Sequence, residues 1–437
     1  MIGRLKQCIG QRNPIRLAYH ACKAFAAALR YGFPARSLTM IGVTGTDGKT
    51  TTVSMVAHIL RATGKNTGIA STAFFDDGTG IKENPSHLTS ISPFVLQNLL
   101  RKMLNNNCTH VVLECSSHGL TQHRLDWTFP KVAALTNTAL EHLDYHGTME
   151  QYRKDKGKLF GMLRGKGTKV LNRNDETFEM YRGIPSAKTI VWKGNQRDRG
   201  NQGTDAQDAL WISDIRSSAT STQASIHLQS AICNLQLSIP GTYNLENAIC
   251  AISVCLALGI DVKASTDALG SFTGIPGRLE RIDEGQPFSV YVDFAVSLQS
   301  YEKTLETLRS NVGKSGRVIV MCSSCGNRMR EKRPQIGKIC SELADIVIAT
   351  EDETYGEDPH AVLEEVWSGV DRSQCEAHKI FDRREAIAFA LKTAKSGDAV
   401  VFCGMGPFST MTKLEGRIPW DERKMVREEL KKLGYRS

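Results

Sequence analysis

The sequence has 437 residues and a formal net charge of +9, which is enough chain for two or three domains with apolar cores. It lacks the run of about eighteen apolar residues that a membrane-spanning helix needs, and its start lacks the features of a signal peptide. The positive charge suits an anionic substrate, whereas nucleic-acid binding is disfavoured because no basic run is interleaved with aromatic residues. The 12 cysteines are scattered, many of them inside apolar runs, which indicates reduced thiols and a cytoplasmic protein.

The pattern of residues 14–35 predicts a helix that begins at Pro14 and is ended by Pro34. A β-prone apolar run follows from Leu38 and leads into the sequence GTDGKTTT, residues 45–52, and then into a helical pattern that Gly64 ends. Strand, glycine-rich turn and helix N-terminus form the arrangement that cradles a nucleotide phosphate.

Within this loop, Lys49 supplies a mobile cation and the Thr50 hydroxyl is a ligand type that suits Mg²⁺. Val43 stands where the common phosphate-binding loop has glycine, so the stretch is a GTxGK[ST]T variant. A βα turn without a ligand is the competing interpretation, and the Lys-Thr-Thr sequence disfavours it.

Two further strands end in polar residues. Ser92 and Pro93 open a helix, after which residues 111–113 form a buried strand with Glu114 at its carboxyl end, and residues 132–135 form another that ends in Thr136 and Asn137. Because ligands bind beyond the carboxyl ends of strands in open α/β sheets, we expect Glu114 and the turn after Thr136 to lie beside the phosphate loop.

The rest of this half has a polar loop over residues 195–207, an alternating pattern over residues 226–239 that predicts a β-hairpin at a sheet edge, and a helix from about residue 241 to Leu258. Residues 274–278, Gly-Ile-Pro-Gly-Arg, have the composition of a hinge. We therefore predict a short helical segment over residues 1–37, a central domain over 38–276 and a C-terminal domain over 277–437.

The C-terminal part repeats the alternation of strands and helices. Strands are predicted at residues 288–293, 317–322, 346–350 and 399–403, and helices at 298–308, 335–343, 361–367, 384–393 and 421–433. The fold class is therefore α/β: a central parallel sheet of the phosphate-loop type with crossover helices, followed by a separate Rossmann-like domain.

Two stretches carry an unusual density of charged and imidazole groups: residues 114–124, ECSSHGLTQHR, and residues 136–147, followed by Tyr152 and Lys156. Such groups at strand ends are costly to bury unless they are paired or metal-bound. For any one histidine, an ordinary surface role is the better interpretation; for the whole set beside a phosphate loop, a magnesium–nucleotide site is favoured.

With these motifs, residues 38–437 resemble the Mur ligase superfamily, and within it the MurE type, which adds the third residue to UDP-N-acetylmuramoyl-dipeptide. The matching stretches are GTDGKTTT, ECSSHGLTQHR, TNTALEHLDYHGTMEQYRKDK and GTYNLENA. Asp47 stands where asparagine is usual and Glu141 where aspartate is usual. The HLDYHG and SSHGL stretches favour this branch over the related folate polyglutamylating and cyanophycin enzymes.

The resemblance implies a role for each matching residue. Lys49 would contact the β- and γ-phosphates of ATP, Thr50 and Glu114 would hold one Mg²⁺, and His142 with Glu114 would hold a second. Lys156 matches a lysine that the family carbamylates to make a ligand for that second metal. The other nucleotide-binding positions implied are Gly45, Thr46, Asp47, Gly48, Thr51, Asn244, Asn247, Arg278 and Asp293, and the substrate-binding positions are Ser116, His118, Arg124, Glu353 and Gly404.

The reaction implied is the ATP-dependent synthesis of an amide in peptidoglycan precursor formation. A substrate carboxylate attacks the γ-phosphate, and the amine of an amino acid then displaces phosphate from the acyl phosphate. Closure at the 274–278 hinge would exclude water from that intermediate. The partners expected are a muramoyl-peptide-like donor and an amino-acid acceptor, with no nucleic acid and no membrane insertion, for a chain that acts as a monomer.

The sequence departs from the family at both ends. MurE enzymes have an N-terminal domain that grips UDP, whereas only residues 1–37 precede the first predicted strand here. We therefore expect a donor that lacks UDP, is held otherwise or is lipid-linked. The family motifs DYAHTPDS, GCGGDRD and GKGHE also become DFAVSLQS at residues 293–300, SSCGNRM at 323–329 and GMGPF at 404–408.

The acceptor motif differs as well. The DNPR stretch that reads diaminopimelate in many MurE enzymes is Asp-Glu-Thr-Tyr at residues 352–355. Because a phenol cannot replace the bidentate guanidinium of arginine, we expect Tyr355 to disfavour diaminopimelate, and Glu353 would favour a basic amino acid such as lysine. The alternative function is an ATP-binding protein without ligase activity that serves regulation or assembly, for which Val296, Pro407 and Phe408 are the motivation.

Overall fold

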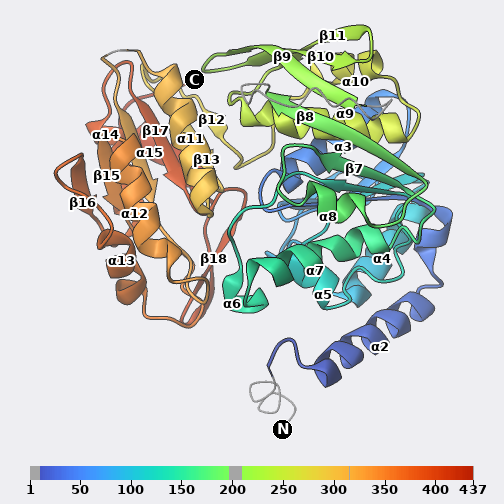
Figure 1. Ribbon diagram of the computed structural model, residues 1–437. Helices are drawn as coiled ribbons and strands as arrows, with labels where there is room; N and C mark the ends of the chain where they lie inside the picture. The colour runs from blue at the N-terminus through green and yellow to red at the C-terminus, as the bar shows by residue number, and fades with distance from the viewer. Residues whose placement is uncertain (1–9, 196–208, 314, 437) are drawn as a thin grey trace. The chain divides into compact units, whose positions relative to one another are not determined.

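The computed structural model describes residues 10–195, 209–313 and 315–436, and the chain divides into two compact units (Figure 1). The first comprises Met1–Arg216, Thr222–Leu237 and Asn244–Phe272, and the second comprises Ser217–Ser221, Ser238–Tyr243 and Thr273–Ser437. Both units are α/β, as predicted. Among the described residues, no helix has the length and apolar character needed to cross a membrane.

The first unit contains an eleven-stranded sheet with the order β11-β10-β9-β8-β7-β6-β1-β5-β2-β3-β4. Its strands are β1 (Thr39–Thr44), β2 (Thr67–Ala70), β3 (Phe74–Asp76), β4 (Ile81–Glu83), β5 (His110–Glu114), β6 (Val132–Leu135), β7 (Thr168–Asn172), β8 (Lys188–Asn195), β9 (Ala209–Ser217), β10 (Thr222–Leu228) and β11 (Ala231–Leu237). The pairs from β9 through β2 are parallel, whereas β3, β4 and the β10–β11 hairpin pair antiparallel at the edges. The predicted edge hairpin is confirmed.

Helices of the first unit connect and cover these strands. They are α2 (Pro14–Arg30), η1 (Pro34–Ser37), α3 (Lys49–Ala62), α4 (Pro93–Asn105), α5 (Ser117–Thr121), α6 (Leu143–His146), α7 (Met149–Gly161), α8 (Phe178–Arg182), α9 (Tyr243–Ala257) and α10 (Val262–Leu269). Apolar side chains of α4 and α7, such as Leu100, Met103 and Phe160, share a buried cluster with Val111 of β5. Burial of these groups against the sheet holds β1, β5 and β6 rigidly beneath the predicted phosphate loop.

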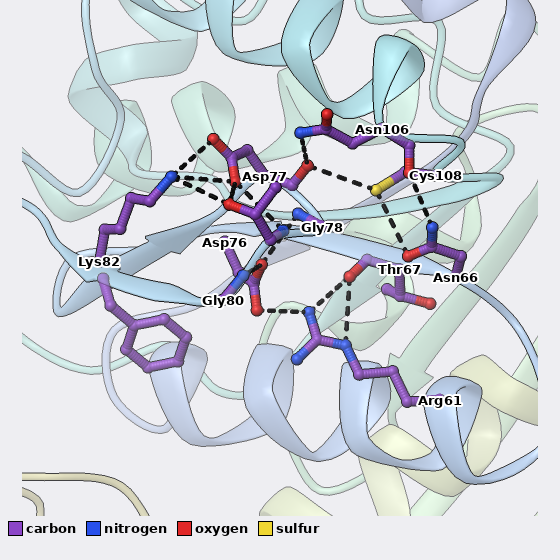
Figure 2. A network of polar contacts seen from close by, with 12 residues as sticks. Arg61, Asn66, Thr67, Asp76, Asp77, Gly78, Gly80, Lys82, Asn106 and Cys108 are labelled. Atoms are coloured by element: carbon purple, nitrogen blue, oxygen red, sulfur yellow. Dashed lines mark hydrogen bonds and ion pairs between the residues drawn. The ribbon is translucent and has the colours of Figure 1, made fainter.

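A network of hydrogen bonds stabilises the β3–β4 edge of this sheet (Figure 2). Asp76 accepts hydrogen bonds from the backbone N–H groups of Gly78 and Gly80 and from the guanidinium of Arg61, at 2.9, 3.2 and 2.9 Å. Asp77 accepts from Lys82 at 3.0 Å. Because both carboxylates already have partners in the hairpin and, for Asp76, in Arg61 of α3, we interpret this cluster as structural.

The second unit contains a six-stranded sheet with the order β12-β13-β17-β14-β15-β16 and a separate β18–β19 pair. Its elements are β12 (Glu280–Ile282), β13 (Ser289–Asp293), α11 (Leu298–Asn311), β14 (Val318–Cys322), α12 (Lys332–Leu343), β15 (Ile346–Ala349), α13 (Pro359–Trp367), β16 (Glu376–Lys379), α14 (Arg383–Thr393), β17 (Ala399–Cys403), β18 (Thr410–Lys413), β19 (Gly416–Pro419) and α15 (Glu422–Lys432). Val320 and Val401 belong to one buried cluster and Ile319 and Val400 to another. Both faces of the sheet are thus covered, as its continuous apolar strands predict.

The N-terminal helix ends at Arg30 rather than at Pro34, which instead opens the 3₁₀ helix η1. The reason is that Gly32 and Phe33 adopt left-handed φ angles and the Arg101 guanidinium hydrogen-bonds the carbonyl oxygen of Tyr31, Nε to O 3.0 Å, so the chain turns before the proline. The predicted polar loop over residues 195–207 lies almost entirely outside the described residues.

Candidate active site

The phosphate loop joins β1 to α3. Gly48 caps the helix with φ 77°, in the left-handed region. A Cβ atom on Gly48 would lie 2.1 Å from Asn247 Oδ1, and one on Gly45 would lie 1.8 Å from Thr136 Oγ1. Neither position has room for a side chain, and the loop leads directly into the N-terminus of α3, the end of a helix that favours an anion.

The turn after β6 forms one wall of this loop. Asn137 accepts hydrogen bonds from the backbone N–H of Thr46 through its carbonyl oxygen, at 2.8 Å, and from that of Asp47 through Oδ1, at 3.0 Å. The Thr136 hydroxyl donates to the Asp47 carbonyl oxygen at 2.7 Å. The prediction that this turn lies beside the loop is confirmed.

Glu114, at the end of β5, connects the phosphate loop to the turn that follows β2. Its Oε2 accepts hydrogen bonds from the Thr50 hydroxyl at 2.9 Å and from the Thr72 N–H at 2.8 Å, and its Oε1 accepts from the Thr72 hydroxyl at 2.9 Å. All three side chains are buried. The predicted proximity of Glu114 to the loop is confirmed. The sequence reading missed Thr72, because it did not recognise the short strand β2 that precedes it.

Two lysines donate hydrogen bonds to carbonyl oxygens of the loop. Lys49 Nζ lies 2.6 Å from the Thr46 oxygen, and Lys156 Nζ lies 2.7 Å from the Gly45 oxygen and 4.2 Å from the centre of the Tyr152 ring. Lys156 is only 1 % exposed. Burial, reinforced by the charge of Lys49, holds the pKa of Lys156 well below its ordinary value.

The oxygen donors at the loop suit Mg²⁺. Thr50 and Glu114 supply a hydroxyl and a carboxylate within hydrogen-bond distance of each other. The described residues hold no group of three or more His, Cys, Asp or Glu side chains arranged as a metal cage. Mg²⁺ does not need one, because it keeps several waters and takes one or two protein ligands together with substrate phosphates. The residues present therefore fit this ion.

The predicted substrate residues lie around the short helix α5. The Ser116 hydroxyl caps α5 by accepting from Gly119 N–H at 3.0 Å, and Arg124 donates to the Ser90 carbonyl oxygen at 2.8 Å. The His118 ring lies 4.8 Å from the His142 ring and 4.1 Å from the Tyr145 ring, measured between centroids. His118 is thus brought next to His142. The substrate and metal roles of these side chains stay predictions.

A second buried array was not recognised in the sequence. Asp155 Oδ2 lies 2.7 Å from His146 Nδ1 and also accepts from Arg12, while His146 Nε2 lies 2.9 Å from the Ser117 hydroxyl. The hydrogen bond from His146 is the largest of the favourable contacts that hold the pKa of Asp155 far below its ordinary value against the opposing effect of burial. Arg12 lies far from Asp155 in sequence, so no local pattern could have revealed this pair.

Four more predicted residues belong to the second unit: Asp293, Glu353 and Gly404 lie at or beyond the carboxyl ends of strands, and Arg278 precedes β12. Asp293 ends β13 and accepts from the Leu279 N–H at 3.0 Å and the Thr304 hydroxyl at 2.7 Å, and burial raises its pKa. The Arg278 guanidinium lies 4.5 Å from the centre of the Phe294 ring. Gly404 follows β17 with φ 115°, where a Cβ atom would lie 2.4 Å from Asp352 Oδ2.

The predicted acceptor residue Glu353 is only 3 % exposed. Its Oε1 accepts from the Thr412 N–H at 3.0 Å and its Oε2 from the Tyr355 hydroxyl at 2.7 Å. Both carboxylate oxygens thus have internal partners. Recognition of a basic amino acid by Glu353 would require one of these bonds to open, and that role stays a prediction.

Comparison with known families adds to this geometry. Residues 43–255 match the Mur ligase middle domain, and residues 277–406 match the Mur ligase, glutamate ligase domain. The chain belongs to the Mur ligase family. The matched ranges contain the phosphate loop, Glu114, Lys156 and Asn247 in the first case and Asp293 and Gly404 in the second.

Individual Mur ligases align along most of the chain. The UDP-N-acetylmuramoyl-L-alanyl-D-glutamate–2,6-diaminopimelate ligase of Geobacillus kaustophilus (strain HTA426) is 32 % identical over 96 % of this chain and 85 % of its own length. The UDP-N-acetylmuramyl-tripeptide synthetase of Roseiflexus sp. (strain RS-1) is 33 % identical over 94 % of this chain and 82 % of its own length. These similarities confirm the predicted resemblance to the MurE type.

Solved structures agree in fold. A UDP-N-acetylmuramoyl-L-alanyl-D-glutamate–2,6-diaminopimelate ligase matches with a TM-score of 0.61 and 28 % identity, covering 91 % of this chain and 79 % of its own. The folylpolyglutamate synthase of Mycobacterium tuberculosis, solved with ADP and AMPPCP, matches with a TM-score of 0.66 and 16 % identity. The match covers 88 % of this chain and 92 % of that one. At that identity the likeness is one of fold alone.

Proposed function

We propose that this chain is an ATP-dependent amide ligase of the MurE type, which joins an amino acid to the carboxylate of a muramoyl-peptide-like donor in peptidoglycan precursor synthesis. The observation that carries the proposal is Glu114, which links Thr50 of a glycine-lined phosphate loop to Thr72 in the turn after β2. Family membership supplies the reaction class, and the loop supplies a place for the nucleotide.

The residues of the loop divide the work of phosphoryl transfer. The N–H groups at the start of α3 would bind the phosphates of ATP, and Lys49 would leave the Thr46 carbonyl oxygen to neutralise charge on the transferring phosphoryl group. Thr50 and Glu114 would hold Mg²⁺, which when bound screens the phosphate charges. The donor carboxylate attacks the γ-phosphate, ADP leaves, and the acceptor amine then displaces phosphate to form the amide.

Lys156 and His142 would serve a second cation site. A lysine amine reacts with CO₂ only when neutral, and the lowered pKa of Lys156 favours that form. The carbamate that results carries an anionic oxygen in place of a cation and releases one proton. Lys156 carbamylation is therefore part of the proposal, and mass spectrometry of the intact chain under CO₂, before and after acidification, would detect it.

For the acceptor, we infer an amino acid other than diaminopimelate. Tyr355 occupies the place of the family's arginine, and its hydroxyl donates to Glu353. A phenol offers a single donor, so it cannot form the paired hydrogen bonds by which arginine holds a carboxylate. Arg328 lies 5.4 Å from the Tyr355 ring centre, and the acceptor panel should include diaminopimelate to test whether that cation substitutes.

The experiment is ADP release by the purified chain with Mg²⁺, ATP, UDP-linked and lipid-linked muramoyl-dipeptides, and a panel of amino acids, with the amide product identified by mass spectrometry. We expect ADP release that requires both donor and acceptor. Lys49→Ala should abolish it, while Lys65→Ala, a change of an exposed lysine beyond the end of the same helix, should leave it unchanged. A folded chain with no donor- and acceptor-dependent turnover across the panel would refute the proposal.

A second candidate function is ATP binding without ligation. Met405, Pro407 and Phe408 stand where the family motif has lysine, histidine and glutamate, and Met405 and Phe408 form a small apolar cluster with Met411 and Phe294. Lys332 Nζ donates to the Val296 carbonyl oxygen at 2.9 Å, in the segment whose family histidine is replaced. This candidate predicts an ATP-induced rise in thermal stability without any acceptor-dependent ADP release, and steady amide formation would exclude it.

A further inference from the structure

The helix α2 belongs to the first unit (Figure 1), and its outer face carries an apolar stripe. Its members are all exposed: Ile15, Ala18, Tyr19, Cys22, Phe25, Ala26 and Leu29. The spacing of three and four residues places them on one side of the helix. Ile15 is 75 % exposed and Leu29 is 61 % exposed. We call this surface the α2 stripe.

The opposite face fixes α2 to the unit. Ala24, Ala27 and Ala28 are buried, α2 packs against α4, and Arg101 on α4 donates to the Tyr31 carbonyl oxygen that follows the helix. The α2 stripe is therefore presented by a docked helix rather than by a loose arm. A contiguous exposed apolar surface of this kind on a rigid support marks an interaction site.

An aromatic group extends the stripe beyond α2. The Phe25 ring lies 5.3 Å from the Trp127 ring, and the Phe33 ring lies 5.7 Å from it, between centroids. The Arg36 guanidinium lies 4.6 Å from the centre of the Phe33 ring. Aromatic side chains with arginine beside them are suited to the boundary between apolar and aqueous phases.

The lysine and arginine residues beside the α2 stripe indicate which kind of partner covers it. Arg16, Lys23 and Arg30 recur every seven residues, each directly after a member of the stripe, so they form a row along one edge of it. Residues 1–46 contain seven lysines and arginines and no aspartate or glutamate. Two copies of α2 packed stripe to stripe would have no carboxylate on either helix to pair with these rows.

We propose that α2 binds the surface of an anionic lipid bilayer, with the α2 stripe buried at the level of the headgroups and the row of cations against lipid phosphates. An apolar face flanked by Lys and Arg is the arrangement of helices that lie in a membrane interface. This is peripheral binding by a helix too short to span a bilayer. It goes beyond the proposed ligase function and is independent of ATP.

The test is co-sedimentation of the full chain with vesicles of phosphatidylcholine, with or without one-third phosphatidylglycerol, in the absence of nucleotide. We expect binding to the anionic vesicles, at least about tenfold weaker partition into neutral ones, and further weakening by salt. Ile15→Ser/Leu29→Ser and Lys23→Gln/Arg30→Gln should each reduce partition by at least about tenfold. These side chains are exposed or, for Lys23, partly exposed, so folding, checked by circular dichroism, should be preserved.

Matched controls come from elsewhere in the first unit. Ile81 and Ile232 are 65 % and 62 % exposed, and Ile81→Ser/Ile232→Ser should bind vesicles as the wild type does. Absence of binding to anionic vesicles, or equal binding by the stripe variant and this control, would overturn the proposal. A dimer in light scattering that Ile15→Ser/Leu29→Ser makes monomeric, without vesicle binding, would assign the stripe to a second copy instead.

Discussion

Replacing Glu114 by glutamine separates its structural role from its proposed catalytic role. In the structure the carboxylate accepts three hydrogen bonds of 2.8–2.9 Å, two at Oε2 and one at Oε1. The glutamine oxygen can keep the two bonds from the Thr50 hydroxyl and the Thr72 N–H. The glutamine NH₂ can donate to the Thr72 hydroxyl, which retains Thr89 Oγ1 at 3.0 Å as its own acceptor.

Glu114→Gln and Glu114→Ala should differ in their effect on the free energy of unfolding. Three charge-assisted bonds become neutral ones, but a buried carboxylate no longer has to be desolvated, so Glu114→Gln should change the free energy of unfolding by at most about 1–2 kcal/mol. Glu114→Ala instead leaves the Thr50 hydroxyl and the Thr72 N–H without their acceptor, at about 1–3 kcal/mol each. Its loss should therefore be at least about 3 kcal/mol once the cavity is included.

Activity should respond differently. Without the anionic oxygen that we propose as a ligand of Mg²⁺, Glu114→Gln should reduce Mg²⁺-dependent ADP release at least about a hundredfold, or about 2.7 kcal/mol in the barrier. Urea unfolding of the metal-free proteins gives the stability, and a coupled ADP assay gives the rate. Near-normal turnover by Glu114→Gln would refute the metal-binding role, and a loss of stability equal to that of Glu114→Ala would refute the hydrogen-bond reasoning.

Three further changes test other parts of the fold. Gly48→Ala should destabilise the chain by about 1–3 kcal/mol and abolish the ATP-induced thermal shift, because its Cβ atom would meet the amide oxygen of the α9 asparagine; an unchanged shift would contradict this. Hydrogen bonding to Arg333 lowers the pKa of Glu357 from 4.5 to about 2. The stabilisation of the folded state by ionised Glu357 is therefore complete above pH 4.5 and is lost as the pH falls towards 2. Glu357→Gln should cost about 1–3 kcal/mol at pH 7, and its urea midpoint should converge with that of the wild type at low pH; a constant difference would contradict the assignment. Arg383→Met should cost about 3–5 kcal/mol in urea unfolding, because it leaves the fully buried Glu422 without its cation, and adding Glu422→Leu should restore much of that loss.

Local patterns in the sequence were sufficient for the phosphate loop and for much of the second unit. The strand predicted at residues 399–403 agrees with β17, and that predicted at 132–135 agrees with β6. Strands buried on both faces give continuous apolar runs, which are easy to recognise. The strands β2, β3 and β4 are not recognisable because, unlike the equally short VAAL of β6, their sequences TGIA, FFD and IKE are not continuous apolar runs. Their antiparallel edge depends on pairing rather than on composition.

The sequence by itself determined the chemistry: a glycine-lined turn with Lys49 and Thr50, and acidic and imidazole groups at strand ends. Only the tertiary structure decided the partners of these groups. Thr72 reaches Glu114, Arg12 reaches Asp155, and the α2 stripe remains on the surface. Turn geometry and apolar periodicity are short-range properties that a sequence records directly. Contacts between residues far apart in the chain, and the side of an amphipathic helix that stays exposed, follow from how the elements pack.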